Sequence, residues 1–76
     1  MQARNALNTI VAHSGYSKTD VARLMGRNDN YIRRFISGGN TPRTDILAEV
    51  ADVCGYDLAL IRRDGSERII IDPPEK

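Results

Sequence analysis

The chain has 76 residues, of which 41% are hydrophobic, 28% charged and 5% aromatic, and eleven Lys and Arg residues stand against ten Asp and Glu. A chain of this length buries only ~60% of the surface that its unfolded form exposes, which leaves room for one small core and excludes a deep substrate cavity. One cysteine and one histidine exclude an intramolecular disulfide and a zinc site built from three or four soft ligands. We therefore expect one small domain with no catalytic residue, no metal and no cofactor.

Charge is unevenly distributed along the chain. Residues 1–43 contain seven basic and two acidic residues, a net charge of +5, whereas residues 44–76 carry a net charge of −4. A basic front half favours an oriented encounter with a polyanion. No run of the sequence approaches the eighteen apolar residues of a membrane span, and the N-terminus lacks the pattern of a signal peptide. The sequence thus predicts a cytoplasmic protein that has no membrane partner.

Helical periodicity begins near the N-terminus. Apolar residues at steps of three and four predict a first helix over about residues 3–13, and Gly15 ends it. Ser17 followed by Asp20 is a capping-box-like start, in which the hydroxyl accepts a first-turn N–H and the carboxylate complements the positive end of the helix. It predicts a short second helix, which Gly26 stops.

Two further helices are predicted before residue 56. Asn28 is a natural N-cap for a third helix over residues 29–36. A fourth helix starts at Thr41-Pro42 or at Thr44, and Gly55 terminates it. The first 57 residues are therefore expected to form a bundle of four short helices.

The period changes from 3.6 to 2 after the fourth helix, which predicts a β-hairpin over residues 58–72. Asp64-Gly65 favours a two-residue type I′ turn. The resulting register pairs Arg62 with Glu67, Leu60 with Ile69, Leu58 with Ile71, Ala59 with Ile70 and Ile61 with Arg68. Residues 73–76 are expected to form a tail.

Both faces of this hairpin carry apolar side chains, and an isolated two-stranded ribbon is marginally stable in water. We therefore expect one face to lie on the helices, and the other face or an edge strand to meet a second copy of the chain. The candidate dimer interface consists of Leu58, Leu60, Ile69, Ile70 and Ile71.

The stretch from Ser17 to Gly38 has the features of a helix-turn-helix. Ala22 is a small residue at the point where the two helices would cross, and Gly26 stands at the sharp turn between them. Ile32 and Phe35 are the inward anchors of the second helix. The set at this spacing predicts a DNA-binding motif more specifically than any one of these residues does.

With these residues in place, the chain resembles the phage Cro and repressor type of DNA-binding domain, the lambda-repressor-like Xre family, over about residues 3–56. The resemblance implies a mainly α fold in which a four-helix bundle spans residues 1–57. Members of the family typically bind operator DNA as dimers, and many repress transcription. Two positions depart from the family pattern, since Arg27 occupies a turn position that is usually small and aliphatic, and Ile36 stands where glutamate is frequent. The hairpin at residues 58–72 replaces the family's usual fifth helix.

The resemblance also implies which residues face DNA. The second helix of such a motif enters the major groove, which is about as wide as a helix. The matching positions for contacts to base edges are Asn28, Asp29, Asn30, Arg33 and Arg34. Arginine can form a bidentate pair with guanine and asparagine with adenine, while Asp29 can either accept from cytosine or complement the helix dipole.

Four other residues are candidates for contacts to the phosphate backbone, namely Lys18, Arg27, Tyr31 and Arg43. Lys18 stands at the start of the first motif helix, where an ammonium group suits a phosphate without reading sequence. Arg27 and Arg43 are alternatively solvated surface residues. Tyr31 alternatively fills the margin of the bundle.

The favoured hypothesis is a sequence-specific transcriptional regulator of phage or bacterial type, a repressor that binds double-stranded DNA as a homodimer. The competing hypothesis is a protein-interaction module, in which the helix-turn-helix is a scaffold and the hairpin or the acidic back surface binds another protein, as an antitoxin binds its toxin.

Overall fold

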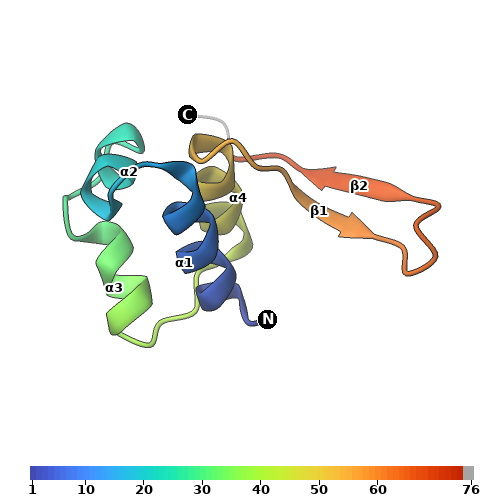
Figure 1. The fold of residues 1–76 in the computed structure, drawn as a ribbon, viewed down its shortest axis with the longest axis horizontal. Coiled ribbons are helices and arrows are strands. Elements are labelled where there is room, and N and C mark those ends of the chain that lie inside the picture. The colour runs from blue at the N-terminus through green and yellow to red at the C-terminus, as the bar shows by residue number, and fades with distance from the viewer. Residues whose placement is uncertain (75–76) are drawn as a thin grey trace.

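The computed structural model describes residues 1–74, which form four helices followed by a two-stranded antiparallel hairpin (Figure 1). The elements are α1 (Ala3–Ser14), α2 (Lys18–Leu24), α3 (Tyr31–Ser37), α4 (Thr44–Val53), β1 (Leu58–Ile61) and β2 (Arg68–Ile71). The mainly α fold expected from the sequence is confirmed. Glu75 and Lys76, the end of the predicted tail, lie outside the described residues. Within residues 1–74, every helix is too short or too polar to cross a membrane.

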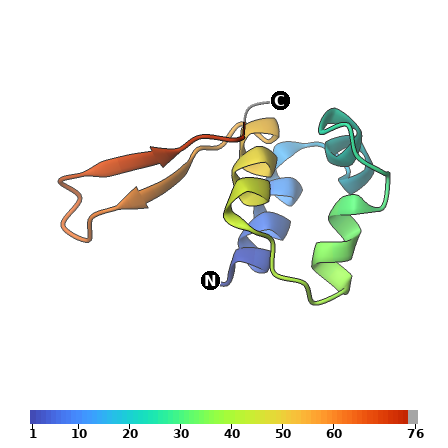
Figure 2. The same ribbon diagram turned by 180° about the vertical axis from the view of Figure 1, so that it is seen from behind.

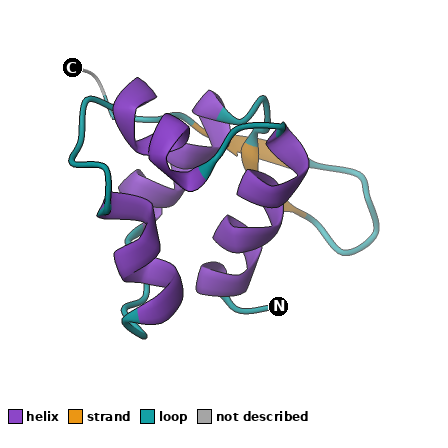
Figure 3. Ribbon diagram, turned by 60° about the vertical axis from the view of Figure 1, so that its left-hand side comes forward, coloured by secondary structure: helices purple, strands orange, loops and turns teal. Residues whose placement is uncertain are grey.

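The core lies between the four helices, whose arrangement Figure 3 shows. Each helix contributes one of the largest fully buried side chains, namely Leu7 from α1, Val21 from α2, Ile32 from α3 and Val50 from α4. Burying one such side chain contributes about 1.5–3 kcal/mol to the stability of the folded state. Because all four helices share this core, the orientation of α3 is fixed by its contacts with the rest of the bundle.

The capping box between α1 and α2 is observed as predicted. The Ser17 hydroxyl accepts the backbone N–H of Asp20 at 3.0 Å, and the Asp20 carboxylate accepts that of Ser17 at 3.4 Å. Gly15 ends α1 with a φ of 84°, a left-handed conformation that glycine adopts without strain. Gly15 and the capping box together fix the short connection between α1 and α2.

The third helix starts later than the sequence suggested. The prediction of a helix over residues 29–36 capped by Asn28 is wrong at its N-terminus, because α3 begins at Tyr31 with Asn30 as its N-cap. The Asn28 carboxamide oxygen accepts the N–H of Asn30 at 3.0 Å, and the Asn28 carbonyl accepts that of Tyr31 at 2.9 Å. Asparagine side chains compete with helical hydrogen bonding in this way. Asp29 and Asn30 therefore lie in a turn that precedes the helix.

The two possible starts of the fourth helix resolve to Thr44, with Arg43 as the N-cap residue in an extended conformation. Pro42 is buried, and Thr41 and Pro42 belong to the loop that joins α3 to α4. Gly55 follows the helix with a φ of 82°, as expected for a helix stop.

The hairpin has the predicted register but not the predicted turn. Leu58, Ala59, Leu60 and Ile61 pair in order with Ile71, Ile70, Ile69 and Arg68. The type I′ turn is wrong, because Gly65 has a φ of 79° whereas Asp64 does not adopt a positive φ. The Asp64 carboxylate instead accepts the Ser66 N–H at 2.9 Å, and the Gly65 N–H donates to the Arg62 carbonyl at 2.8 Å. The aspartate's bond to the backbone two residues on favours this longer loop over the two-residue turn.

The hairpin projects away from the bundle, as Figures 1 and 2 show from opposite sides. The expectation that one face would lie on the helices is wrong for its outer part, since Leu60 and Ile61 are each 61% exposed. Only the base of the hairpin is half-buried, at Leu58, Ala59 and Ile71. The strands leave the bundle at the end of α4, so their outer residues lie beyond the reach of the helices.

Candidate nucleic-acid interface

One exposed stripe runs along α3 and the turn before it, opposite the buried Ile32. It consists of Asn30, Arg33, Arg34 and Ser37, all of which are exposed. Steps of three and four residues place them on one side of a helix. The Arg33 guanidinium donates to the Asn30 carboxamide at 3.4 Å, and the Ser37 hydroxyl donates to the Arg33 carbonyl at 2.7 Å. The stripe presents polar groups of the size and chemistry that read base edges.

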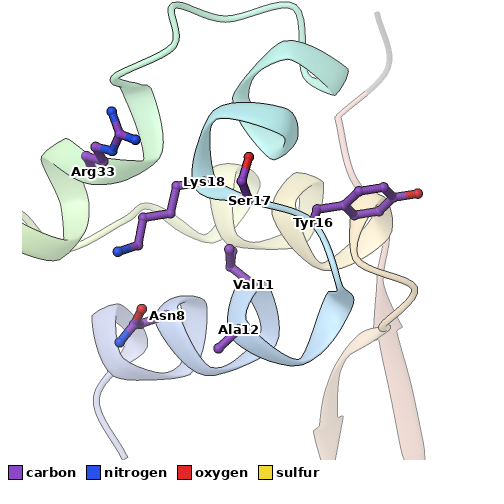
Figure 4. A pocket seen from close by; sticks show the side chains of 7 residues that line it. All are labelled: Asn8, Val11, Ala12, Tyr16, Ser17, Lys18 and Arg33. Carbon is purple, nitrogen blue, oxygen red and sulfur yellow. The ribbon is translucent and has the colours of Figure 1, made fainter.

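A hollow of about 390 Å³ lies beside this stripe, between α1, the start of α2 and α3 (Figure 4). Lys18 lies between Asn8 of α1 and Arg33 of α3, and Val11 forms part of the floor. The full lining is Asn8, Val11, Ala12, Tyr16, Ser17, Lys18 and Arg33. Two cations and a carboxamide from three different helices around one shallow hollow suit the oxygens of a phosphate backbone.

A second hollow, of about 450 Å³, lies on the other flank of α3. It is lined by Arg27, Tyr31, Phe35, Asn40, Thr41, Arg43 and Ile46. The Arg27 guanidinium stacks 5.1 Å from the centre of the Tyr31 ring, and that ring meets Phe35 edge to face at 5.3 Å. Tyr31 is half-buried, so it both closes the margin of the bundle and forms part of the lining.

The two arginines of the second hollow also take part in ion pairs within the chain. Arg27 lies 3.8 Å from the carboxylate of the buried Glu49, and Arg43 lies 3.1 Å from that of Asp45. Their side chains are nonetheless 45% and 78% exposed. Both can therefore meet a second anion without leaving the first.

Asp29 is held by an arginine that the sequence analysis did not single out. Arg23 of α2 donates from Nε to Asp29 Oδ1 and from Nη2 to Asp29 Oδ2, both at 3.0 Å. These hydrogen bonds from the guanidinium hold the pKa of the Asp29 carboxyl below its usual range. The pair spans the turn between α2 and α3. In this conformation both carboxylate oxygens have a partner, and a contact from Asp29 to a base stays a prediction.

The nine residues predicted to contact DNA fall into groups in space. Asn30, Arg33 and Arg34 share the stripe, Asn28 and Asp29 lie in the turn before α3, Lys18 and Arg33 line the first hollow, and Arg27, Tyr31 and Arg43 line the second. The structure adds Asn8, Asn40 and Thr41, which the sequence analysis did not include. These residues belong to α1 and to the loop after α3. Both segments lie close to the predicted site only in the folded chain, so residue spacing along the sequence does not reveal them.

The remaining candidate for chemistry is the thiol of Cys54. Burial raises its pKa, and this outweighs a hydrogen bond with Ser14 that acts in the opposite direction. The neutral form is therefore favoured. In residues 1–74, no group of three or more His, Cys, Asp and Glu side chains is arranged to hold a metal ion.

Comparison with known proteins adds one finding. A family model described as helix-turn-helix matches residues 10–61, from the second half of α1 to the end of β1. The match covers more than half of the chain and includes the stripe, the second hollow and every lining residue of the first hollow except Asn8. No curated protein and no solved structure matches the chain significantly.

Proposed function

The chain belongs to the helix-turn-helix family of the Xre, Cro and C1 type, whose members are DNA-binding transcriptional regulators, and we propose that it is a sequence-specific repressor of phage or bacterial type. In this proposal, α3 enters the major groove of double-stranded DNA. Two copies bind together, one to each half of a palindromic site.

The observation that carries the proposal is the arrangement around α3. A polar stripe that includes Arg33 and Arg34 is flanked by two hollows, each lined by two cationic side chains. The major groove offers base edges at its floor and phosphates along both rims. One helix with readers along its exposed side and cations on each flank matches that layout.

The readers differ in what they recognise. Arg34 and Arg33 suit guanine, because a guanidinium donates to O6 and N7 together, and Asn30 suits adenine at N6 and N7. Asn28 precedes them in the turn and is the next candidate. Lys18, Arg27, Tyr31 and Arg43 contact the backbone in this proposal, and Asn8, Asn40 and Thr41 extend those contacts.

A homodimer is supported by the hairpin. Leu60 and Ile69 are 61% and 51% exposed, and Ile70 is 40% exposed. Leu60 and Ile69 are cross-strand partners on one face of the hairpin, and Ile70 lies on the opposite face. Exposed apolar side chains on both faces support an interaction site. We propose that Leu58, Leu60, Ile69, Ile70 and Ile71 lie in the interface between two copies.

Selection of binding sites from a random DNA library tests the proposal. The expected result is one enriched sequence with two inverted half-sites whose centres lie about one helical turn apart. The selection is run at low salt, where phosphate contacts are strongest. Recovery of unenriched sequence under those conditions would reject sequence-specific binding.

The same exposed hairpin also favours a second candidate function, in which the chain is an interaction module that binds a toxin-like protein. That function predicts a chain that stays monomeric by itself at high concentration and selects no DNA site. A dimer that selects a site contradicts it as the chain's main role.

A further inference from the structure

The outer edge of strand β2 has a charge pattern that complements its own copy. The segment from Arg68 to Asp72 reads Arg-Ile-Ile-Ile-Asp, with opposite charges at equal distances from Ile70. We propose that two copies of the chain join edge to edge along β2, antiparallel and centred on Ile70, so that the hairpins form one four-stranded sheet. The proposal rests on the homodimer of the proposed function and names the surface and register of that dimer.

The backbone of β2 is oriented for this pairing. The Arg62 N–H donates to the Glu67 carbonyl at 2.9 Å, so these two residues form a hydrogen-bonded pair of the ladder. Hydrogen-bonded pairs alternate along antiparallel strands, and the observed register therefore directs the N–H and C=O groups of Arg68 and Ile70 away from β1. Continued by two residues, the same alternation turns those of Asp72 outward. With a two-fold axis between the two Ile70 residues, the outward N–H and C=O groups of Arg68, Ile70 and Asp72 in each copy all find hydrogen-bond partners in the other copy.

The charged side chains of this edge have no competing partner in the described part of the chain. Arg68 lies opposite Ile61, and within residues 1–74 neither Arg68 nor Asp72 takes part in an ion pair or a side-chain hydrogen bond. Both are exposed. In the proposed register Arg68 lies directly opposite Asp72 of the second copy, where cross-strand side chains interact. Each copy contributes to two such pairs, which flank three tiers of isoleucine.

The other strand is a poorer edge. β1 is the strand that packs against α4, and its first two residues, Leu58 and Ala59, are half-buried. Figure 1 shows β2 along the upper side of the hairpin with β1 below it, so that the upper edge of β2 faces away from β1. A free strand edge with unpaired backbone groups is a template for another strand.

Charge reversal tests the register by sedimentation of the full chain without DNA. Arg68→Asp and Asp72→Arg each replace two attractive pairs by two repulsive ones, and each is expected to raise the dimer dissociation constant by roughly tenfold. The double variant R68D/D72R restores both pairs between copies and is expected to recover the parental dissociation constant. Within one chain these positions are four residues apart on an extended strand, so recovery has no intrachain explanation. Arg63→Asp, in the loop, is the matched control for a change of the same charge and leaves association unchanged.

Amide hydrogen exchange gives an independent measurement of the edge. The N–H groups of Arg68, Ile70 and Asp72 are expected to become protected as concentration rises through the dissociation constant, whereas the N–H groups of Ile69 and Ile71 are protected at all concentrations. A parental dimer in which R68D/D72R stays weak, or in which residues 59 and 61 gain the protection, overturns the β2 register and leaves the homodimer standing. A parent that stays monomeric at high concentration overturns both, and leaves DNA binding by α3 to the selection experiment.

Discussion

The helical bundle and the hairpin handle the same type of residue in opposite ways. The bundle buries its large aliphatic side chains against one another, as Leu7, Val21, Ile32 and Val50 demonstrate with at most a trace of exposure. The hairpin leaves Leu60 and Ile61 more than half exposed. The bundle therefore buries its apolar side chains within one chain, while the outer hairpin leaves apolar side chains exposed, which in our proposal pack against a second copy.

The largest expected effect is a loss of stability on truncating a side chain in the core of the bundle. Ile32→Ala removes a side chain with 0% exposure from the centre of the core, and the free energy of unfolding is expected to fall by about 2–5 kcal/mol. Leu60→Ala is the matched aliphatic truncation in the hairpin. In urea unfolding well below the dimer dissociation constant it is expected to change the free energy by less than about 0.5 kcal/mol. A large loss from Leu60→Ala in the monomer contradicts the contrast between the regions.

Helical periodicity predicted the bundle correctly because the apolar face of each helix packs against the apolar faces of the other helices in the same chain. The same reasoning failed where a polar side chain competes with the backbone. Asn28 was predicted to cap a helix but closes a turn with Asn30, and Asp64 bonds to Ser66 instead of adopting a left-handed conformation. The placement of the hairpin was also mispredicted, because a sequence with two apolar faces does not say which face a single chain can cover.

The next effect concerns the stripe on α3 and is the largest expected in DNA binding. Arg34→Ala is expected to remove about 1–3 kcal/mol of discrimination at one base pair of the selected site, and to leave the preference at other positions intact. The measurement is the affinity for the selected duplex and for its single-base variants at one salt concentration. An Arg34→Ala variant whose loss is the same for every duplex would make Arg34 a backbone contact.

A smaller effect on DNA affinity, the same for every sequence, is expected from a substitution in the first hollow. Lys18→Ala is expected to weaken binding to all duplexes about equally, because an ammonium group on a phosphate carries no sequence information. The slope of log affinity against log salt concentration is expected to become shallower by about 1, the contribution of one phosphate contact. Thr19→Ala, at the next residue of the same helix, is the control for effects on α2. An unchanged slope in Lys18→Ala removes Lys18 from the phosphate contacts.

The candidate site was less predictable than the fold. The stripe followed from helical spacing once Ile32 was assigned to the core, and Arg33 and Arg34 are exposed as expected. The partners of the charged residues did not follow, because they come from other elements. Arg23 reaches Asp29 across a turn, Arg27 reaches Glu49 of α4, and Asn8 of α1 lines the same hollow as Lys18. Such contacts depend on how the helices pack.

The smallest effect concerns the Arg23–Asp29 pair, which ties the turn before α3 to α2. Because the pKa of Asp29 is lowered by the hydrogen bonds from Arg23, its stabilising contribution is present above the ordinary value of 3.8 and is lost as pH falls through the lower, folded value. The Asp29 carboxyl, followed by NMR, is thus expected to titrate below 3.8 in the parent and closer to 3.8 in Arg23→Ala.

The same pair is expected to affect DNA binding. The substitution Arg23→Ala leaves the Asp29 charge unpaired near phosphates, so the affinity for DNA falls, and adding Asp29→Asn restores part of the loss. Equal affinity for the single and double variants would instead make Arg23 a direct phosphate contact. A loss of preference at one base pair in Asp29→Asn alone would assign Asp29 to cytosine.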